Sequence, residues 1–105
     1  MFYRVTARLR IQTGADFLRK LTDGTVARQS PDGQEIVDAM NRAVLTDDGK
    51  VAWSEICYCP TPLAHERATV FDKHFEALET DVIEGYQDDD GRPFMAYLAE
   101  LVEAK

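Results

Sequence analysis

The chain has 105 residues, of which 45% are hydrophobic, and its net charge is −7. This size suits one domain with one core, and the hydrophobic content excludes a disordered chain, so we expect a single domain over residues 1–105. The acidic balance repels phosphate backbones, which excludes nucleic acid as an expected partner. The sequence shows neither a signal peptide nor an apolar run of membrane-spanning length, so we expect a cytoplasmic protein that does not bind membranes.

Residues 2–11 alternate between apolar and polar side chains, which predicts a half-buried strand. Its polar face carries Arg4, Arg8 and Arg10. Residues 13–22 place apolar side chains at helical spacing, and Asp23-Gly24 follows as a stop signal, although the helix could also continue towards Gln29.

The next segment, residues 35–46, fits two structures. Its apolar residues suit a helix, yet it leads into Asp48-Gly49, which is a strong hairpin signal between two apolar runs. Residues 51–58 are rich in strand-forming side chains. We therefore expect a hairpin over residues 35–59, with a helix over 35–46 as the alternative.

A helix is predicted over residues 61–78, with Thr61 as its N-cap and Pro62 at its first position. Residues 81–87 fit either a fourth strand or a short helix. Pro93 opens a last helix with an apolar stripe. The resulting order, β-α-β-β-α-β with an extra C-terminal helix, resembles that of ferredoxin-like α+β domains. That resemblance implies an antiparallel sheet with helices on one face, but no particular function.

The densest group of reactive residues is Cys57-Tyr58-Cys59, followed by His65 and His74. The spacing of these cysteines and histidines matches no zinc motif, and the two histidines would lie on different faces of one helix, so we expect no metal and no cofactor. Cys59 precedes a predicted helix start and His65 follows one turn later, a placement that can activate a thiol. No catalytic motif accompanies them, which favours a protein without catalysis and leaves an enzyme as the alternative.

A pocket between sheet and helices is the alternative to a purely structural role for these side chains. His74 fits a core histidine or a pocket acid or base, and the aromatic residues fit the core, an interface or a pocket wall. The candidate pocket residues are Trp53, Cys57, Tyr58, Cys59, His65 and His74.

Charge is unevenly distributed along the chain. Residues 71–105 hold 3 basic and 10 acidic residues, which account for the whole net charge of −7. We expect this acidic third either to be solvated or to meet a basic protein partner. We also expect a homodimer, formed by an apolar sheet face with Trp53, Ile56 and Tyr58 or by the interface candidates Arg4, Arg8 and Arg10 against the acidic third.

Two function classes follow. The first is a small interaction or regulatory module without catalysis that self-associates. The second is a small-molecule-binding domain or enzyme, with a pocket between sheet and helices lined by aromatic, His and Cys residues.

Overall fold

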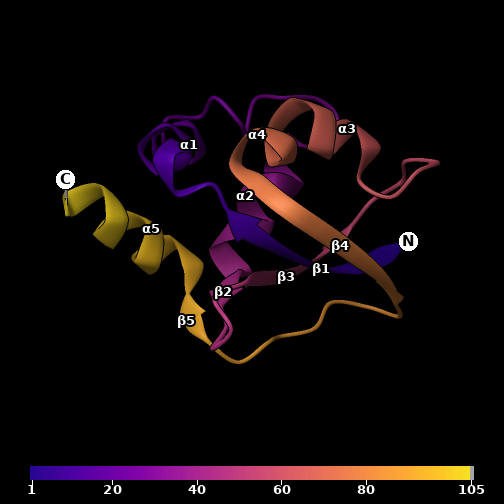
Figure 1. Cartoon of the computed structure of the whole chain (residues 1–105). Helices are drawn as coiled ribbons and strands as arrows, with labels where there is room; N and C mark the ends of the chain where they lie inside the picture. Colours follow the sequence, from indigo (N-terminus) through magenta and orange to yellow (C-terminus); the bar gives the residue numbers. More distant parts are fainter. Residues whose placement is uncertain (105) are drawn as a thin grey trace.

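The computed structural model describes residues 1–104 and shows an α+β fold, an open antiparallel sheet of five strands combined with helices (Figure 1). The strands are β1 (Phe2–Leu9), β2 (Val44–Leu45), β3 (Val51–Ile56), β4 (Phe75–Ile83) and β5 (Arg92–Pro93). Their order across the sheet is β4-β1-β3-β2-β5, and every neighbouring pair is antiparallel.

Three regular helices and one composite helical stretch accompany the sheet. The regular helices are α1 (Gly14–Thr22), α2 (Gly33–Arg42) and α5 (Phe94–Glu103). A short 3₁₀ turn, η1 (Ile11–Thr13), precedes α1. The composite stretch consists of α3 (Ala64–Glu66), the π-helix η2 (Arg67–Phe71) and α4 (Asp72–His74). Within residues 1–104, no helix has the length and apolar character needed to cross a membrane.

The strand predicted over residues 2–11 is confirmed, with β1 at the centre of the sheet between β4 and β3. Tyr3, Val5 and Ala7 are buried beneath the helices, while Arg4 and Thr6 point to the opposite face. The helices expected after Thr13 and Pro93 are also present as α1 and α5, and α1 ends at Thr22, directly before the Asp23-Gly24 stop signal.

The hairpin predicted over residues 35–59 is wrong in its first half, because residues 33–42 form α2. Ile36, Ala39 and Met40 lie on one face of this helix and are fully buried, so helical packing prevails over the strand alternative. A shorter hairpin remains between β2 and β3. Its turn contains Gly49 with φ of 81°, where the Asp-Gly signal placed it.

The helix predicted over residues 61–78 is too long at both ends. The helical stretch begins at Ala64 and ends at His74, and residues 75–83 are strand β4. Phe75 and Leu78 fit the helical stripe by spacing, but Phe75 instead pairs with Leu9 of β1 and is buried. The fourth strand thus starts earlier than residue 81, since pairing with β1 satisfies its backbone.

An aromatic cluster fills the core between sheet and helices. The Trp53 ring centroid lies 5.1 Å from those of both Phe71 and Phe75. Phe75 also lies 5.6 Å from Phe17 and 5.9 Å from Phe94, so β3, β4, α1, η2 and α5 meet there. Trp53 is therefore a core residue, and the expectation that it forms an apolar patch on the open sheet face is wrong.

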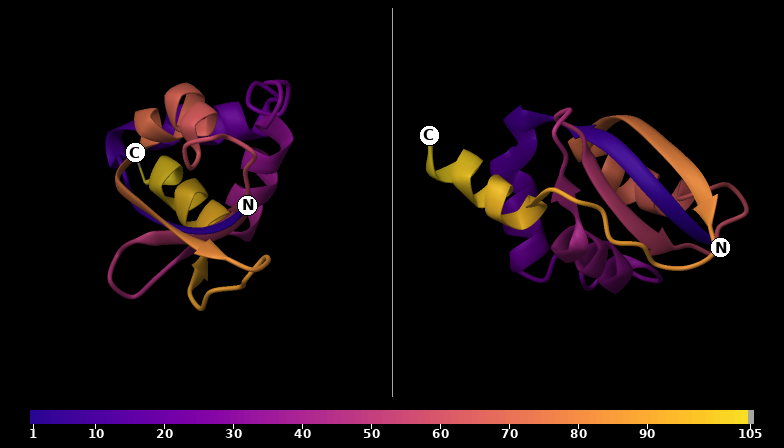
Figure 2. Two further views of the ribbon diagram at one scale, coloured as in Figure 1. Left: turned by 90° about the vertical axis from the view of Figure 1, so that its right-hand side faces the viewer. Right: turned by 90° about the horizontal axis from the view of Figure 1, so that it is seen from below.

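The segment 84–91, here called the strap, links β4 and β5 across the sheet face that carries no helices (Figures 1 and 2). Ser54 Oγ donates to the carbonyl of Gln87 at 2.9 Å and accepts from its N–H at 3.0 Å. Arg4 binds Asp89 at 3.0 Å, and Tyr86 contacts the Phe2 ring edge to face. The strap thus covers part of the face opposite the helices.

Candidate functional site

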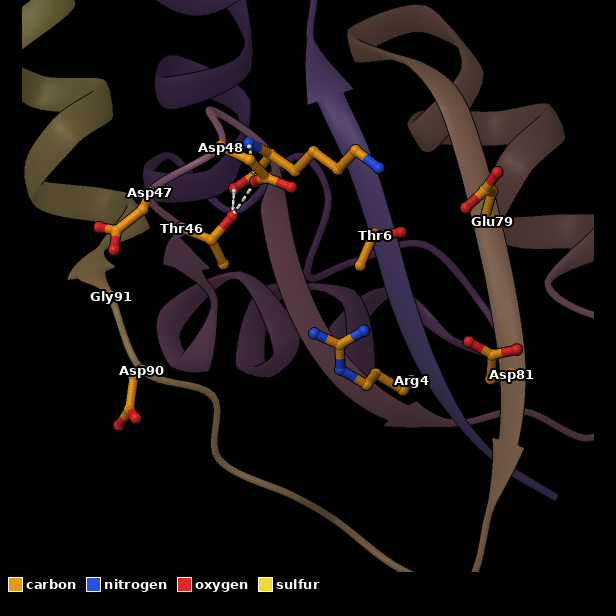
Figure 3. A pocket seen from close by; sticks show the side chains of 10 residues that line it. Arg4, Thr6, Thr46, Asp47, Asp48, Glu79, Asp81, Asp90 and Gly91 are labelled. Carbon is orange, nitrogen blue, oxygen red and sulfur yellow. Dashed lines mark hydrogen bonds between the residues drawn. The ribbon is translucent and has the colours of Figure 1, made fainter.

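The open sheet face bears a wide groove of about 580 Å³ between β4 and the β2–β3 turn (Figure 3). Its lining residues are Arg4, Thr6, Thr46, Asp47, Asp48, Lys50, Glu79, Asp81, Asp90 and Gly91. Some of these polar groups already have hydrogen-bond partners within the chain. Asp48 accepts hydrogen bonds from the Thr46 hydroxyl and the Lys50 N–H, and these bonds hold the pKa of Asp48 below its usual value. The groove is a polar, solvated surface.

A second, smaller pocket of about 240 Å³ lies where β3 ends, beside α2 and α3. Most of its wall is apolar. It is lined by Pro31, Asp32, Glu35, Ile56, Cys57, Tyr58, Cys59 and Glu66. We refer to it as the Glu66 pocket.

Three local features build this pocket. The Met1 backbone pairs with that of Cys57 and so prolongs the β1–β3 ladder to the pocket floor. Leu63 is buried with φ of 57° and turns the chain into α3, where Glu66 lies. Gly33 packs so closely on the Val26 carbonyl that a Cβ would lie 2.1 Å from its oxygen, which fixes the start of α2 beside Asp32.

Two neighbouring carboxyls, those of Glu55 and Glu66, are buried at this site with exposures of 0% and 1%. The Glu55 side chain points inward from β3 and accepts a hydrogen bond from Trp53 Nε1 at 2.7 Å. Burial raises the pKa of Glu55 well above its usual value, and the nearby Glu66 raises it further. Burial also raises the pKa of Glu66, whereas Glu55 opposes that shift, so Glu55 is the member that retains a proton.

Glu66 differs from the other carboxylates of the pocket in that its hydrogen-bonding neighbours are the Glu55 carboxyl and the Cys57 thiol. Asp32 binds His65 Nδ1 at 2.9 Å. Glu35 accepts from the Ile56 N–H and the Tyr86 hydroxyl, both at 3.0 Å, and lies 3.5 Å from Arg42. Both Glu66 carboxyl oxygens are buried, as is Glu55 Oε2. The proton that Glu55 retains supplies the donor that such a buried carboxylate needs.

The two thiols are not arranged for nucleophilic chemistry. Burial raises the pKa of Cys57 to about 11, so its thiol stays protonated at neutral pH. Its sulfur accepts the Cys59 N–H at 3.3 Å. The helical stretch begins only at Ala64, five residues after Cys59, so Cys59 is not at a helix N-terminus. A reactive thiolate at this position is therefore not supported.

The structure brings together three of the six candidate pocket residues, Cys57, Tyr58 and Cys59, on the wall of the Glu66 pocket. His65 reaches the rim through its bond to Asp32. Trp53 lies behind the pocket and touches Glu55. His74 lies elsewhere, with its ring stacked 4.2 Å from that of Phe17. Over residues 1–104, no group of three or more His, Cys, Asp or Glu side chains is arranged to hold a metal ion.

The interface candidates are engaged within the chain to different degrees. Arg4 forms its ion pair with Asp89 of the strap. Arg8 lies opposite Glu76 in the β1–β4 register. Arg10 donates its backbone N–H to the His74 carbonyl at 2.7 Å.

The carboxyl residues of the pocket were missed by sequence reasoning. Glu55 carried a usable signal, because it follows Trp53 by two residues on a strand and so shares its inward face. Glu66, Asp32 and Glu35 gave no such signal, since each meets the pocket through tertiary packing of α2 and α3 against the end of β3. Comparison of the chain with protein-family models, curated proteins and solved structures finds no match.

Proposed function

We propose that the protein is a small-molecule-binding domain whose ligand occupies the Glu66 pocket. The observation that carries this proposal is the concave, mostly apolar pocket itself, on whose wall the carboxylates of Asp32, Glu35 and Glu66 lie beside Cys57 and Tyr58. An apolar pocket with a few convergent polar groups is typical of ligand sites.

The size and lining of the pocket support the same function. Its volume of about 240 Å³ lies just below the range of drug-sized ligand sites, so it suits a small metabolite. Cys57 and Tyr58 converge on it, as expected of a pocket that combines apolar and polar contacts. Tyr58 is 85% exposed beside the opening, where an aromatic ring can cover a bound molecule.

A fragment screen followed by amide NMR spectroscopy tests the proposal. Fragments that bind should shift the amide signals of residues 56–59 and of Asp32, because these residues form the wall. Cys57→Leu adds side-chain volume to the wall and should abolish the shifts. Cys57→Ala is the matched control: it removes volume, keeps the pocket open and should retain binding. Shifts that persist in Cys57→Leu, or that map to the sheet groove, would contradict the proposal.

A second candidate function, an interaction module that self-associates or docks a basic protein, is supported by the groove on the open face. Five of its lining residues are acidic against two basic ones, and the acidic third of the chain supplies Glu79, Asp81 and Asp90. A basic surface on a partner would match this charge.

The sheet order supports a finer description of the frame. We propose that β1 to β4 with their connecting helices form a ferredoxin-like core, to which β5 and α5 are added. The support is the antiparallel order β4-β1-β3-β2. A cytoplasmic location is likewise a proposal, supported by two free cysteines, Cys57 and Cys59.

A further inference from the structure

We propose that the carboxyl pair of Glu55 and Glu66 is a pH switch: the proton that the pair shares joins α3 to β3, and its loss opens the wall of the Glu66 pocket. The switch itself follows from the burial of the pair. Its control of ligand binding rests on the proposed function, because it concerns the same pocket.

The first argument is that the carboxyl pair is buried without a compensating cation. The two residues are 0% and 1% exposed. Among residues 1–104, no lysine, arginine or histidine side chain forms an ion pair with either of them. Two ionised carboxylates in such a place would repel each other without the hydration that water gives them. One member of the pair therefore has to hold a proton for as long as both are buried.

The hydrogen bonds of Glu55 show where this proton lies. Its Oε1 accepts the Trp53 indole N–H at 2.7 Å, so the proton belongs on Oε2, which is also buried. The protonated Glu55 carboxyl then donates to the Glu66 carboxylate, a bond that raises the pKa of Glu55 in addition to its burial. Hydrogen bonds between an acid and a carboxylate are charge-assisted and stronger than neutral ones. A single proton thus links the sheet to α3.

The groups around the carboxyl pair come from several elements, and none of them replaces the proton. They are the Met1 amino group and Tyr3 on the β1 side, Cys57 after β3, Asp32 and Glu35 from α2, and His65 from α3. The nearby basic side chains, Arg42 and His65, are bound to Glu35 and Asp32. The Met1 amino group donates to the Cys57 carbonyl. The remaining neighbours are acidic or neutral, so they add to the repulsion that deprotonation creates.

The second argument concerns which side of this link can move. Glu55 lies on β3, which is held between β1 and β2 by backbone pairing. Glu66 lies on α3, which has only three residues and continues into the π-helix η2. Leu63, directly before α3, takes a left-handed conformation that is unfavourable for its side chain. π-helical turns are rare and are frequent at functional sites. We therefore expect α3 to move away from β3 when the proton is lost, and the pocket wall to change with it.

The sign of the pH dependence follows from the burial of the pair. Burial raises the pKa of Glu55 well above its usual value of 4.5. The folded chain therefore holds more protons than the unfolded chain in the range between these two values. The stability that the shared proton contributes is fully present below pH 4.5 and is lost as pH rises through the higher value.

Urea denaturation of the unmodified protein and of Glu55→Gln between pH 5 and pH 9 tests the link. The glutamine amide accepts from Trp53 through its oxygen and donates to Glu66 through its N–H at every pH. The ratio of the unfolding constants, unmodified protein over Glu55→Gln, should rise about tenfold per pH unit until the shared proton is lost. The contributions of His65 and His74 cancel in this ratio because both proteins contain them.

Glu79→Gln is the matched control, because it makes the same change at an exposed position of β4. Its ratio to the unmodified protein should not change with pH. A ratio for Glu55→Gln that is equally flat would overturn the inference.

A measurement on the unmodified protein keeps the inference testable if Glu55→Gln does not fold. Trp53 is the only tryptophan of the chain and donates to Glu55, so its fluorescence emission should change in one step as the proton is lost. The amide NMR signals of residues 57–66 should shift in the same step without any ligand. Burial raises the pKa of Cys57 to about 11, so its thiol stays protonated over this range. An emission step that leaves these amide signals unchanged would show titration without opening, and the inference would be wrong.

The fate of the proposed function is read separately. A fragment that binds the Glu66 pocket at pH 5.5 should lose affinity over the emission step in the unmodified protein and keep its affinity in Glu55→Gln. Equal affinity on both sides of the step in the unmodified protein would overturn the control of binding by the switch. If no fragment binds at any pH while the stability ratio and the amide signals change as expected, the proposed function is wrong and the switch stands.

Discussion

At the scale of single residues, His74 shows how packing determines a protonation state. The Thr13 hydroxyl donates its proton to the Arg10 carbonyl, so it can only accept from His74 Nδ1, which lies 2.9 Å away. The imidazole therefore carries its proton on Nδ1, and Nε2 is buried without a partner in the described chain. Burial lowers the pKa of His74 to about 4, with the Lys20 charge as a smaller cause.

This histidine predicts a loss of stability in mild acid. A His pKa that is lower in the folded state than in the unfolded state favours the folded state above the unfolded value of about 6.5, and that advantage is lost as pH falls towards 4. Between pH 7 and pH 5, urea denaturation should show a loss of about 2 kcal/mol from this residue. His74→Phe preserves the stacking on Phe17 and should remove that part of the loss. An equal pH slope in both proteins would contradict the assignment.

The candidate site was partly predictable from single residues. Cys57, Tyr58 and Cys59 stood out because reactive and aromatic side chains are concentrated there. Glu66 did not, because a glutamate in a helix is most often solvated and only the packing of α3 against β3 buries it. The local sequence therefore identified the cysteine and tyrosine residues of the pocket wall but not its buried glutamate.

At the scale of elements, β4 is bent by a bulge. Its register with β1 shifts between Thr6 and Arg8, and Ala77 takes a left-handed conformation with φ of 53°. This conformation costs an alanine roughly 1–2 kcal/mol and costs glycine little.

Replacing Ala77 by glycine should therefore stabilise the protein by up to about 1 kcal/mol, despite the greater freedom of glycine in the unfolded chain. Thermal and urea denaturation measure the change. Ala96→Gly is the matched control, since Ala96 is also exposed but lies within α5, where glycine should cost about 1 kcal/mol. Opposite signs are expected, and destabilisation by both substitutions would show that the bulge is not strained.

Elements whose apolar residues repeat with one clear period were predicted well. The boundaries between elements were not. The alternation in β1 and the stripe of α5 agree with the structure because each faces one core surface along its whole length. Residues 35–42 and 75–78 were misassigned, since short apolar runs satisfy helical and strand spacing alike. Residues 75–78 form a strand because they pair with β1. Such a long-range contact produces no recognisable pattern in the local sequence.

At the scale of the whole molecule, charge bears on the proposed self-association. Asp89, which belongs to the acidic third, forms an ion pair with Arg4 of the same chain. Part of the charge pairing that we expected between two copies therefore occurs within one chain. An ion-pair dimer would have to use other charges, such as those of the acidic groove.

Light scattering at low and high salt distinguishes the forms of association. If the proposed dimer is held by charge, it should dissociate at high salt, because a Debye length of about 3 Å at 1 M screens exposed pairs. A dimer that persists at high salt would point to apolar contacts. A monomer at high micromolar concentration in both buffers would contradict self-association altogether.

The two edge strands of the sheet also determine how readily strands of other molecules can pair with it. The edge strand β4 carries Glu76, Glu79 and Asp81 and is bent at Ala77. The other edge strand, β5, is only two residues long and includes Pro93, which has no N–H to donate. Charge, bending and proline are the means by which natural sheets resist recruiting further strands. A fibre built by adding strands is therefore opposed at both edges of the sheet, so assembly of intact copies through these edges is disfavoured.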